Sequence, residues 1–329
     1  MIKYINHIAT AVIASTAACL GGYFIYKIHN KKQLVKKKVH EIVLIFDHKE
    51  VFIKNIVFFR EKIKRFVEDG GHKLQVLSDF DRTLSKHFVE GEKGFTSFGV
   101  VEHSQYFPTY VKKQLLSLHE KYHPIEMSTT ITEEAKIPYM VEWWAEAFML
   151  AVNAGVQKRH IPDMVRNSRV VLRDGADQFF HLLHEKNIPL LIVSAGLGDI
   201  INEVMLQQAE LTRNISITAN FYTFNSEGLA TGLRGNEMIH SFNKNQHLKH
   251  KTDYFEKHKD RTNLIVMGDT LGDPSMADGI FPSENILKIG FLNEKAEESL
   301  NAYLEVYDVV LTNDANLDRL TVFLHALLC

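Results

Sequence analysis

The chain has 329 residues, of which 45% are hydrophobic and 24% charged, and its formal net charge is −2. This composition allows a large packed core, argues against disorder and offers no general basic field that would attract nucleic acid. The two cysteines, Cys19 and Cys329, lie near opposite ends of the chain, which argues against a disulfide framework and a cysteine zinc site.

An uncharged and mostly apolar stretch covers residues 8–26 and, as a helix, would be long enough to cross a bilayer. Lys3 precedes this stretch, whereas six lysines follow it between residues 27 and 38. The positive-inside rule therefore predicts a membrane anchor that tethers a cytoplasmic catalytic part to an intracellular membrane. A buried or poorly ordered N-terminal helix is the alternative.

Residues 31–68 are lysine-rich, with apolar side chains at helical spacing such as Ile42, Ile45 and Phe52. This pattern predicts one or two amphipathic helices that cover the core. Six short apolar runs follow and resemble buried strands. Because helical segments separate most of them, the predicted fold class is α/β, a Rossmann-like doubly wound parallel sheet. The expected strands are 74–77, 189–193, 215–218, 264–267, 286–289 and 309–311, and the expected helices between them are 175–186, 200–210 and 252–259.

The gap between the first two strands is too long for a plain crossover and carries helical patterns at 111–122, 139–152 and 158–166. We interpret it as an inserted helical cap. Residues 221–234 are expected to form a β-hairpin appended to the core. The predicted organisation has four parts: the anchor candidate with its basic flank (1–30), the N-terminal helices with the first core strand (31–87), the helical cap (88–168) and the rest of the core (169–329).

Two aspartates directly follow the first expected strand, in the order Asp79-Phe80-Asp81-Arg82-Thr83. Two like charges this close are costly unless a cation lies between them, and Mg²⁺ prefers such oxygen ligands. One carboxylate could then attack phosphorus, while the other protonates the leaving oxygen and later activates water. A pair of solvated turn aspartates is the alternative reading of this motif on its own.

Three further segments carry groups that suit a phosphate. Ser194-Ala195-Gly196 closes the second expected strand with a hydroxyl and N–H groups. Lys244 offers a positive charge, and Asp269 and Asp273 follow the fourth strand. Each signal is weak alone, but in this order the segments resemble the motifs of the haloacid-dehalogenase-like (HAD-like) phosphatases, whose ligands bind at the carboxyl ends of the strands.

From about residue 76 to residue 311, the chain resembles the cytosolic 5′-nucleotidase III family, the pyrimidine 5′-nucleotidases. Residues 78–85, 138–143, 194–199 and 268–279 carry this resemblance. It implies a Mg²⁺-dependent phosphomonoesterase that hydrolyses nucleoside 5′-monophosphates through an aspartyl-phosphate intermediate. The implied roles are nucleophile for Asp79, acid/base for Asp81, metal ligands for Asp79, the Asp81 carbonyl and Asp269 with support from Asp273, and phosphate contacts for Ser194, Ala195 and Lys244.

In this family the cap recognises the base, and the family's acidic base-reader matches Glu126. A carboxylate can only accept hydrogen bonds, so it selects bases that present donors. The chain departs from the pyrimidine enzymes at Phe98, Trp144 and Ala147. Aromatic rings around a carboxylate suit a cationic base such as 7-methylguanine. CMP or UMP and 7-methyl-GMP therefore both stay open as substrates, with a slight lean towards 7-methyl-GMP or a broad range.

Two alternative functions remain at this point. A nucleoside phosphotransferase would use the same residues and pass the phosphate to a nucleoside instead of water. An inactive, membrane-tethered scaffold is expected to lack one of the four central groups, and Asp79, Asp81, Lys244 and Asp269 are all present. We expect a monomer that binds a nucleotide and no nucleic acid polymer.

Overall fold

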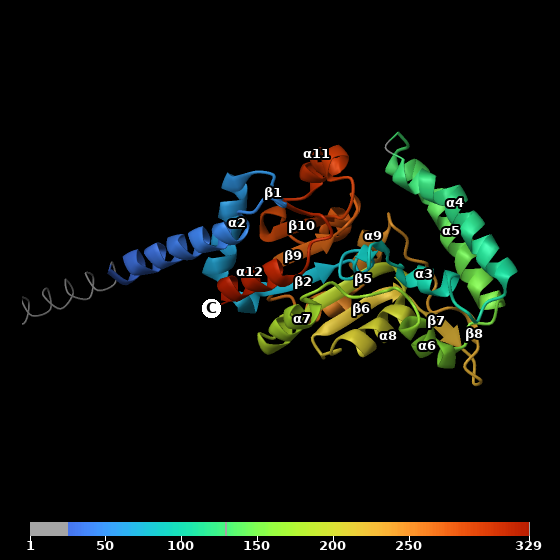
Figure 1. The fold of residues 1–329 in the computed structure, drawn as a ribbon. Coiled ribbons are helices and arrows are strands. Elements are labelled where there is room, and N and C mark those ends of the chain that lie inside the picture. Colours follow the sequence, from blue (N-terminus) through green and yellow to red (C-terminus); the bar gives the residue numbers. More distant parts are fainter. Residues whose placement is uncertain (1–25, 129, 329) are drawn as a thin grey trace, which may run out of the picture.

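The computed structural model describes residues 26–128 and 130–328. The anchor predicted over residues 8–26 lies outside these ranges except for Tyr26. Within the described ranges, no helix combines the length and the apolar character that crossing a membrane requires. A seven-stranded sheet with helices on both faces forms the larger part of the protein, and a long pair of helices stands beyond one end of it (Figure 1).

The sheet has the order β1-β11-β10-β9-β2-β5-β6, and all neighbours except β1 and β11 run parallel. All six strands expected from the sequence are present, so the predicted parallel α/β sheet is confirmed. β2 and β9, which each end in an aspartate motif, are direct neighbours. The strands are β1 (Val51–Ile53), β2 (Leu74–Ser78), β5 (Leu190–Leu197), β6 (Ile215–Asn220), β9 (Asn263–Gly268), β10 (Ile286–Leu292) and β11 (Val309–Thr312).

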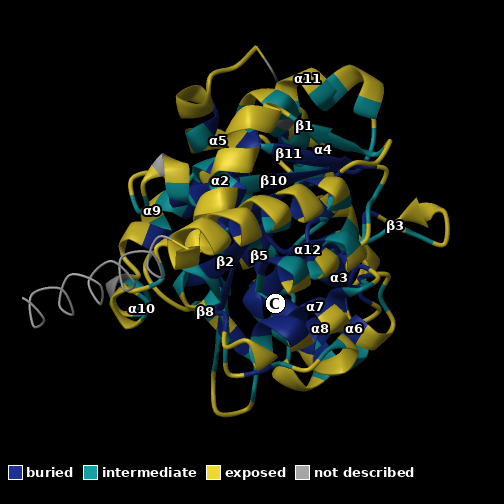
Figure 2. Ribbon diagram, turned by 90° about the vertical axis from the view of Figure 1, so that its left-hand side faces the viewer, coloured by how far each residue is buried: buried dark blue, intermediate teal, exposed yellow. Residues whose placement is uncertain are grey.

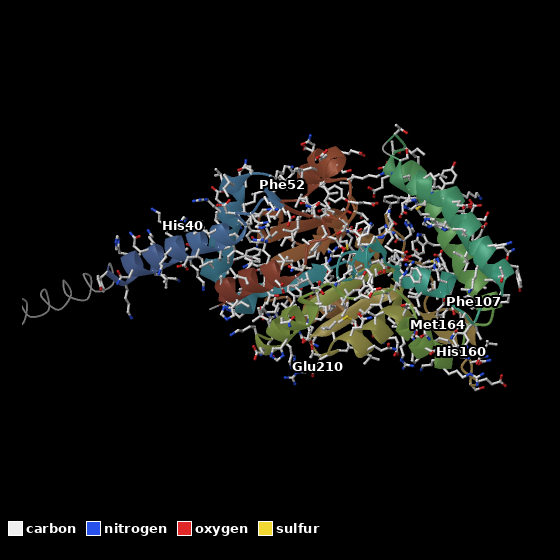
Figure 3. The ribbon with its side chains drawn as sticks, in the orientation of Figure 1. His40, Phe52, Phe107, His160, Met164 and Glu210 are labelled. Atoms are coloured by element: carbon white, nitrogen blue, oxygen red, sulfur yellow. The ribbon has the colours of Figure 1, made fainter. Side chains whose placement is uncertain are left out.

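The edge strand β1 corrects the sequence analysis, which placed Phe52 in a helix. β1 pairs antiparallel with β11, and Figure 3 labels Phe52 at this edge of the sheet. Helix α2 (Ile56–Asp69) begins only after Asn55, whose side chain accepts two backbone N–H groups of the first turn. β-Branched and aromatic residues in front of an asparagine N-cap indicate a strand that ends before a helix.

Successive side chains of the central strands face two different layers of helices. Ile192 and Met267 belong to one hydrophobic cluster, whereas their neighbours Val193 and Val266 belong to another on the opposite face. This alternation is typical of a doubly wound sheet that is buried on both faces. One face packs against α2, α7 (Ala176–Glu185), α8 (Gly198–Gln208) and α12 (Asp318–Leu328), and the other against α9 (Lys244–Lys249), α10 (Thr252–Lys257) and α11 (Ala296–Val306).

Residues 26–45 form a helix that is exposed over most of its length (Figure 2). Val35, Val39 and Ile42 are buried and recur at helical spacing, so they form a single apolar stripe. Phe46, just beyond this helix, makes edge-to-face contacts with phenylalanine rings of α2 and α12. The predicted amphipathic helix that covers the core is thus confirmed in this segment.

The cap region contains two long helices, α4 (Thr109–Met127) and α5 (Glu133–Asn153), which contact each other. Both extend past the predicted bounds. The sequence analysis ended the first helix before Pro124 and began the second after Pro138, whereas both prolines lie inside the helices. The division of the chain at residues 88 and 168 stays a prediction. The shorter elements of this region are the hairpin β3 (Phe88–Val89) and β4 (Glu92–Lys93), α3 (Ser97–Glu102) and α6 (Ile161–Arg166).

The hairpin expected at residues 221–234 is present as β7 (Tyr222–Phe224) and β8 (Ala230–Leu233). It forms its own two-stranded sheet instead of extending the core sheet. The ring of Tyr222 stacks on Phe148 of α5 with a centroid distance of 4.6 Å. The Tyr222 N–H also donates to Asp199 of α8, so the hairpin, which directly follows core strand β6, contacts both the core and α5.

Candidate active site

The carboxyl ends of the central strands bring Asp79, Lys244 and Asp273 into direct contact. Asp79 follows β2, and its Oδ1 accepts a hydrogen bond from Lys244 Nζ at 2.5 Å. The same ammonium donates to Asp273 Oδ1 at 2.8 Å. All three side chains are buried, so these charges are held in a site of low dielectric where their interactions are strong.

Asp79, Asp269 and Asp273 form a cluster that could hold a metal ion. One carboxylate oxygen from each lies within 4.8 Å of the others. Carboxylate oxygens are the ligands that hard divalent cations prefer, and the single Lys244 charge balances only part of the three negative charges. The residues present therefore fit a divalent cation. The carboxylate of Asp81 is not part of this cluster.

The pKa values of this cluster show how strongly its members resist carrying their charges together. Burial raises the pKa of Asp79 to about 7, although Lys244 acts in the opposite direction. Burial, and then the nearby Asp79 and Asp273 carboxylates, raise the pKa of Asp269 well above its usual range. Burial opposes the charge of Lys244, but the two aspartates outweigh it and raise the pKa of the ammonium. A divalent cation would relieve this repulsion.

The loop from Asp269 to Asp273 is held by contacts that the sequence analysis did not identify. Asp273 Oδ2 accepts backbone N–H groups of Asp269 at 3.1 Å and Thr270 at 2.9 Å. A Cβ atom at Gly268 would lie 2.2 Å from Cβ of Asp273, so only glycine permits this close approach. The hydroxyl of Tyr303 in α11 donates to the Asp269 carbonyl oxygen, and that of Tyr307, just after α11, donates to the Thr270 carbonyl oxygen.

Asp81 faces Ser97, the first residue of α3. Its Oδ1 accepts the Ser97 backbone N–H at 2.6 Å, and its Oδ2 accepts the Ser97 hydroxyl at 2.6 Å. Burial raises the pKa of Asp81, while these two hydrogen bonds favour the ionised form. Sequence reasoning missed Ser97: a Thr-Ser pair before an apolar run predicts the start of a helix, but not what its hydroxyl contacts.

The turn at the end of β5 brings Ser194 next to Asp81. A Cβ atom built at Gly196 would lie 2.7 Å from Asp81 Oδ2 and 3.1 Å from Ser194 Oγ, so the two side chains flank this glycine. The Ser194 hydroxyl accepts the Gly196 N–H at 2.9 Å. Asn220, which the sequence analysis did not identify, donates to the Ala195 carbonyl at 2.7 Å and ties the turn to β6.

Arg173 supports the loop that carries Asp79 and Asp81, and the sequence analysis did not identify it either. Its guanidinium donates to the carbonyl oxygens of Arg82 at 2.5 Å and Thr83 at 2.7 Å, the residues that directly follow Asp81. It also donates to Asn293 Oδ1 and Asp314 Oδ1, both at 2.7 Å. Arg82 has φ 61°, a left-handed conformation that a non-glycine residue adopts only when its surroundings hold it.

The cap reaches the core site through Glu126 of α4. Its carboxylate accepts a hydrogen bond from the hydroxyl of Ser241, three residues before Lys244. Nearby, Lys136 of α5 donates to the Glu126 carbonyl at 2.8 Å and lies 5.4 Å from the ring centroid of Phe242. Burial raises the pKa of Glu126, and Ser241 acts against this shift. The predicted base-reader thus faces the core loop that leads to Lys244, the predicted phosphate-binding residue.

The other predicted base-binding residues differ in their burial and in their contacts. Phe98 and Ala147 are buried in the hydrophobic core, and the Phe98 ring meets Trp144 edge-on at 6.0 Å. Trp143 stacks with Tyr122, as a cap packing residue does. The indole N–H of Trp144 is buried and has no hydrogen-bond partner among the described residues.

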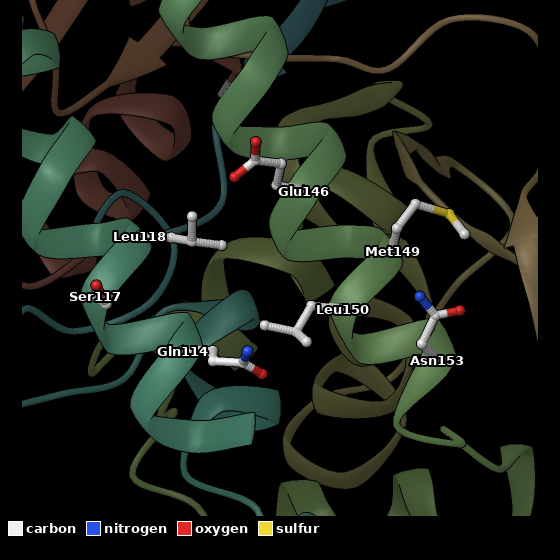
Figure 4. A pocket seen from close by; sticks show the side chains of 7 residues that line it. All are labelled: Gln114, Ser117, Leu118, Glu146, Met149, Leu150 and Asn153. Atoms are coloured by element: carbon white, nitrogen blue, oxygen red, sulfur yellow. The ribbon is translucent and has the colours of Figure 1, made fainter. Parts of the chain in front are cut away.

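A separate groove of about 410 Å³ lies between α4 and α5 (Figure 4). Gln114 and Ser117 line it from α4, and Met149 and Asn153 from α5. None of the predicted site residues contributes to it, so this groove is distinct from the catalytic centre.

Comparison with known proteins agrees with this geometry. The family model for Pyrimidine 5′-nucleotidase (UMPH-1) matches residues 82–328. The 7-methylguanosine phosphate-specific 5′-nucleotidase of Homo sapiens is 41% identical over 260 residues, which cover 79% of this chain and 86% of that protein. The Putative cytosolic 5′-nucleotidase 3 of Caenorhabditis elegans is 34% identical over 319 residues, covering 94% of this chain and 83% of that protein.

A solved structure shows the same similarity in three dimensions. The crystal structure of cytosolic 5′-nucleotidase IIIB bound to cytidine superimposes with a TM-score of 0.80 at 31% identity, covering 88% of this chain and 97% of the other. The sequence matches and the shared fold support one another. The chain belongs to the pyrimidine 5′-nucleotidase family and is a phosphomonoesterase that hydrolyses nucleoside 5′-phosphates.

Proposed function

We propose that the protein hydrolyses a nucleoside 5′-monophosphate through a phosphoaspartate on Asp79, with Mg²⁺ as its metal ion. The observation that carries this proposal is the contact of Asp79 with Lys244 inside a cluster of buried acids. Asp79, Asp269 and Asp273 would hold the cation, whose charge would let a carboxylate approach an anionic phosphate. The Asp81 backbone carbonyl is proposed as a further ligand, because its carboxylate is bonded to Ser97.

The side chains divide the reaction between them. Asp79 forms a bond to phosphorus as the bond from phosphorus to O5′ breaks, and Asp81 gives its proton to the departing O5′. Asp81 then removes a proton from water, which attacks phosphorus and releases phosphate from Asp79. Lys244, the Ser194 hydroxyl and the Ala195 backbone N–H bind the phosphate oxygens during both stages.

The substrate base is proposed to lie between Glu126 and Trp144. Glu126 accepts hydrogen bonds from base N–H groups, while the unpartnered indole N–H of Trp144 donates to a base oxygen. Phe98 presents an edge to Trp144 and, with Ala147, shapes the apolar wall behind it. The curated relatives are named as specific for 7-methylguanosine phosphate, and the solved neighbour holds cytidine. We therefore propose 7-methyl-GMP as the preferred substrate and CMP as a second one.

The experiment is a side-by-side measurement of kcat/KM for 7-methyl-GMP, CMP, UMP and GMP with Mg²⁺. We expect 7-methyl-GMP to be fastest and GMP slowest, because the cationic base suits the carboxylate and the aromatic rings. Asp79→Asn keeps the side-chain volume and is expected to abolish phosphate release from every substrate. Release of phosphate by this variant at the wild-type rate would rule out the phosphoaspartate, and equal rates for 7-methyl-GMP and GMP would rule out the proposed base preference.

The location and assembly of the protein are further proposals. The relatives with cytosolic names and the six lysines after residue 26 support a cytoplasmic catalytic part. The membrane anchor over residues 8–26 rests on the sequence pattern alone. Fractionation of cells that express the full chain should place it in the membrane fraction, and a soluble full-length chain would reject the anchor. Light scattering on the purified protein tests the proposed monomer.

A further inference from the structure

The carboxylate of Asp81 depends on one residue for all its hydrogen bonds. Both oxygens accept from Ser97, one from the backbone N–H and one from the hydroxyl, at 2.6 Å each. No other hydrogen bond to this carboxylate occurs among the described residues. Ser97 is completely buried, so water does not compete for these contacts.

The direction of the Ser97 hydroxyl proton follows from its second neighbour. The Ser97 Oγ also accepts the backbone N–H of Leu197, the last residue of β5, at 3.2 Å. Since Leu197 N–H can only donate, the single hydroxyl proton is left for Asp81 Oδ2. Each Asp81 oxygen therefore has one lone pair committed to Ser97, and a proton carried by Asp81 must lie on the side turned away from Ser97.

Ser97 also connects three parts of the active site. It starts helix α3 at the entry to the cap, it holds the Asp81 carboxylate, and it contacts the strand end that carries Ser194. A Cβ atom at Gly196 would lie 1.9 Å from Ser97 Oγ, which shows how closely the hydroxyl sits against the phosphate-binding turn.

We propose that Ser97 is a positioning residue that aims the transferable proton of Asp81 at the leaving oxygen of the substrate. This inference rests on the proposed function, because it assumes that Asp81 is the acid. Ser97 itself touches neither the phosphate nor the base; it fixes the plane of the carboxylate, so that the free side of the carboxylate faces the cleft. Loss of the hydroxyl leaves one hydrogen bond in place of two, and the carboxylate can then turn away.

A change of the leaving atom separates this role from a merely structural one. In a nucleoside 5′-phosphate the departing O5′ is an alkoxide that needs a proton. In the 5′-thio analogue, with sulfur in place of the bridging oxygen, a thiolate departs without one. Both substrates present the same base and phosphate to the site. kcat/KM reports only the events up to departure of the leaving group, so the later hydrolysis of phosphoaspartate does not enter the comparison.

The test measures kcat/KM of Ser97→Ala with 7-methyl-GMP and with its 5′-thio analogue. General acid catalysis contributes about 10²–10⁴-fold, and a misplaced acid should lose a part of it. We expect a loss of about 10–100-fold with the oxygen substrate and less than about threefold with the sulfur substrate. Ser97→Cys keeps the volume with a weaker donor, shows the same direction, and serves if Ser97→Ala does not fold.

Two further variants make the outcome decisive. Ser104→Ala removes a buried hydroxyl just beyond the other end of α3. In the described part of the chain this hydroxyl bonds only to Tyr106 N–H, so its loss should affect both substrates equally and little. Asp81→Asn should lose activity mainly on the oxygen substrate, and the double variant with Ser97→Ala should lose no more than Asp81→Asn alone. If Asp81→Asn shows no such preference, the proposed acid role itself fails. The inference about Ser97 is tested when Asp81→Asn does lose activity mainly on the oxygen substrate. It is then wrong if Ser97→Ala lowers kcat/KM equally on the oxygen and sulfur substrates, or raises it on 7-methyl-GMP.

Discussion

Replacement of Arg173 tests whether the loop that carries Asp79 and Asp81 depends on a support that no motif reveals. Arg173→Met keeps the length of the side chain but removes the guanidinium, which is 2% exposed. Four acceptors then each lose a donor: the carbonyl oxygens of Arg82 and Thr83 and the side chains of Asn293 and Asp314. The half-buried Asp314 carboxylate would also lose its cation and keep, among the described residues, only the backbone N–H groups of His87 and Phe88 as donors.

The size of the effect follows from the loss of a buried ion pair. Removing one partner of such a pair typically costs about 3–5 kcal/mol of unfolding free energy. For a chain of 329 residues, whose unfolding entropy is about 0.7 kcal/mol/K, we expect the melting temperature to fall by about 4–7 °C. Arg173→Lys keeps the charge but cannot reach both loop carbonyls as a fork, so it should recover part of the stability and little of the activity. Because the loop carries Asp81, kcat should fall at temperatures where the variant is still folded.

Calorimetry and kcat on 7-methyl-GMP, measured at least 15 °C below each melting temperature, check both expectations. Arg261→Met is the matched control: this arginine also bonds to backbone carbonyls, of Leu74 and Asn187, but these lie at the opposite ends of the strands. It should lower stability and leave kcat unchanged. An Arg173→Met protein with wild-type kcat would show that Arg173 does not position the loop, and one with wild-type stability would refute the ion-pair argument.

Three other changes have expected outcomes. Glu126→Ala should lower kcat/KM for 7-methyl-GMP by about 10–100-fold through loss of charged hydrogen bonds, with a smaller effect on a generic ester such as phenyl phosphate; equal losses would contradict base recognition. Mg²⁺ at 100 times its Kd should stabilise the fold by about 2.7 kcal/mol in denaturant unfolding, and Asp269→Asn, which removes one carboxylate of the cluster, should weaken this gain; an unchanged gain would place the ion elsewhere. Burial raises the pKa of Glu102 to about 7, so the folded protein holds this proton more tightly than the unfolded chain. As pH rises from about 4.5 to 7 the buried carboxyl must ionise, and the free energy of unfolding falls. Glu102→Gln should therefore match the wild type at pH 4 and exceed it by about 1–3 kcal/mol at pH 8, and a constant difference across this range would refute the assignment.

The sequence alone contained enough information to predict six of the seven strands of the sheet and to name candidate site residues. Apolar runs of strand length, separated by helical segments, predict a parallel sheet because both its faces must be buried. Asp79 and Asp269 could be predicted as candidate site residues because they lie just after strands, where the topology collects such groups at one edge. Phe52 shows the limit of this reasoning, since a short edge strand beside a helix has the same apolar residues as the helix itself.

Tertiary structure alone decided which side chains hold the reactive groups in place. Arg173 lies 90 positions from Thr83, and Ser97 lies 100 positions from Leu197, so no local pattern connects either pair. The same holds for Glu126, whose contact with Ser241 spans 115 positions and joins the cap to the core. Short-range periodicity determines elements because it reflects local geometry, whereas a hydrogen bond between distant segments exists only after the chain has packed.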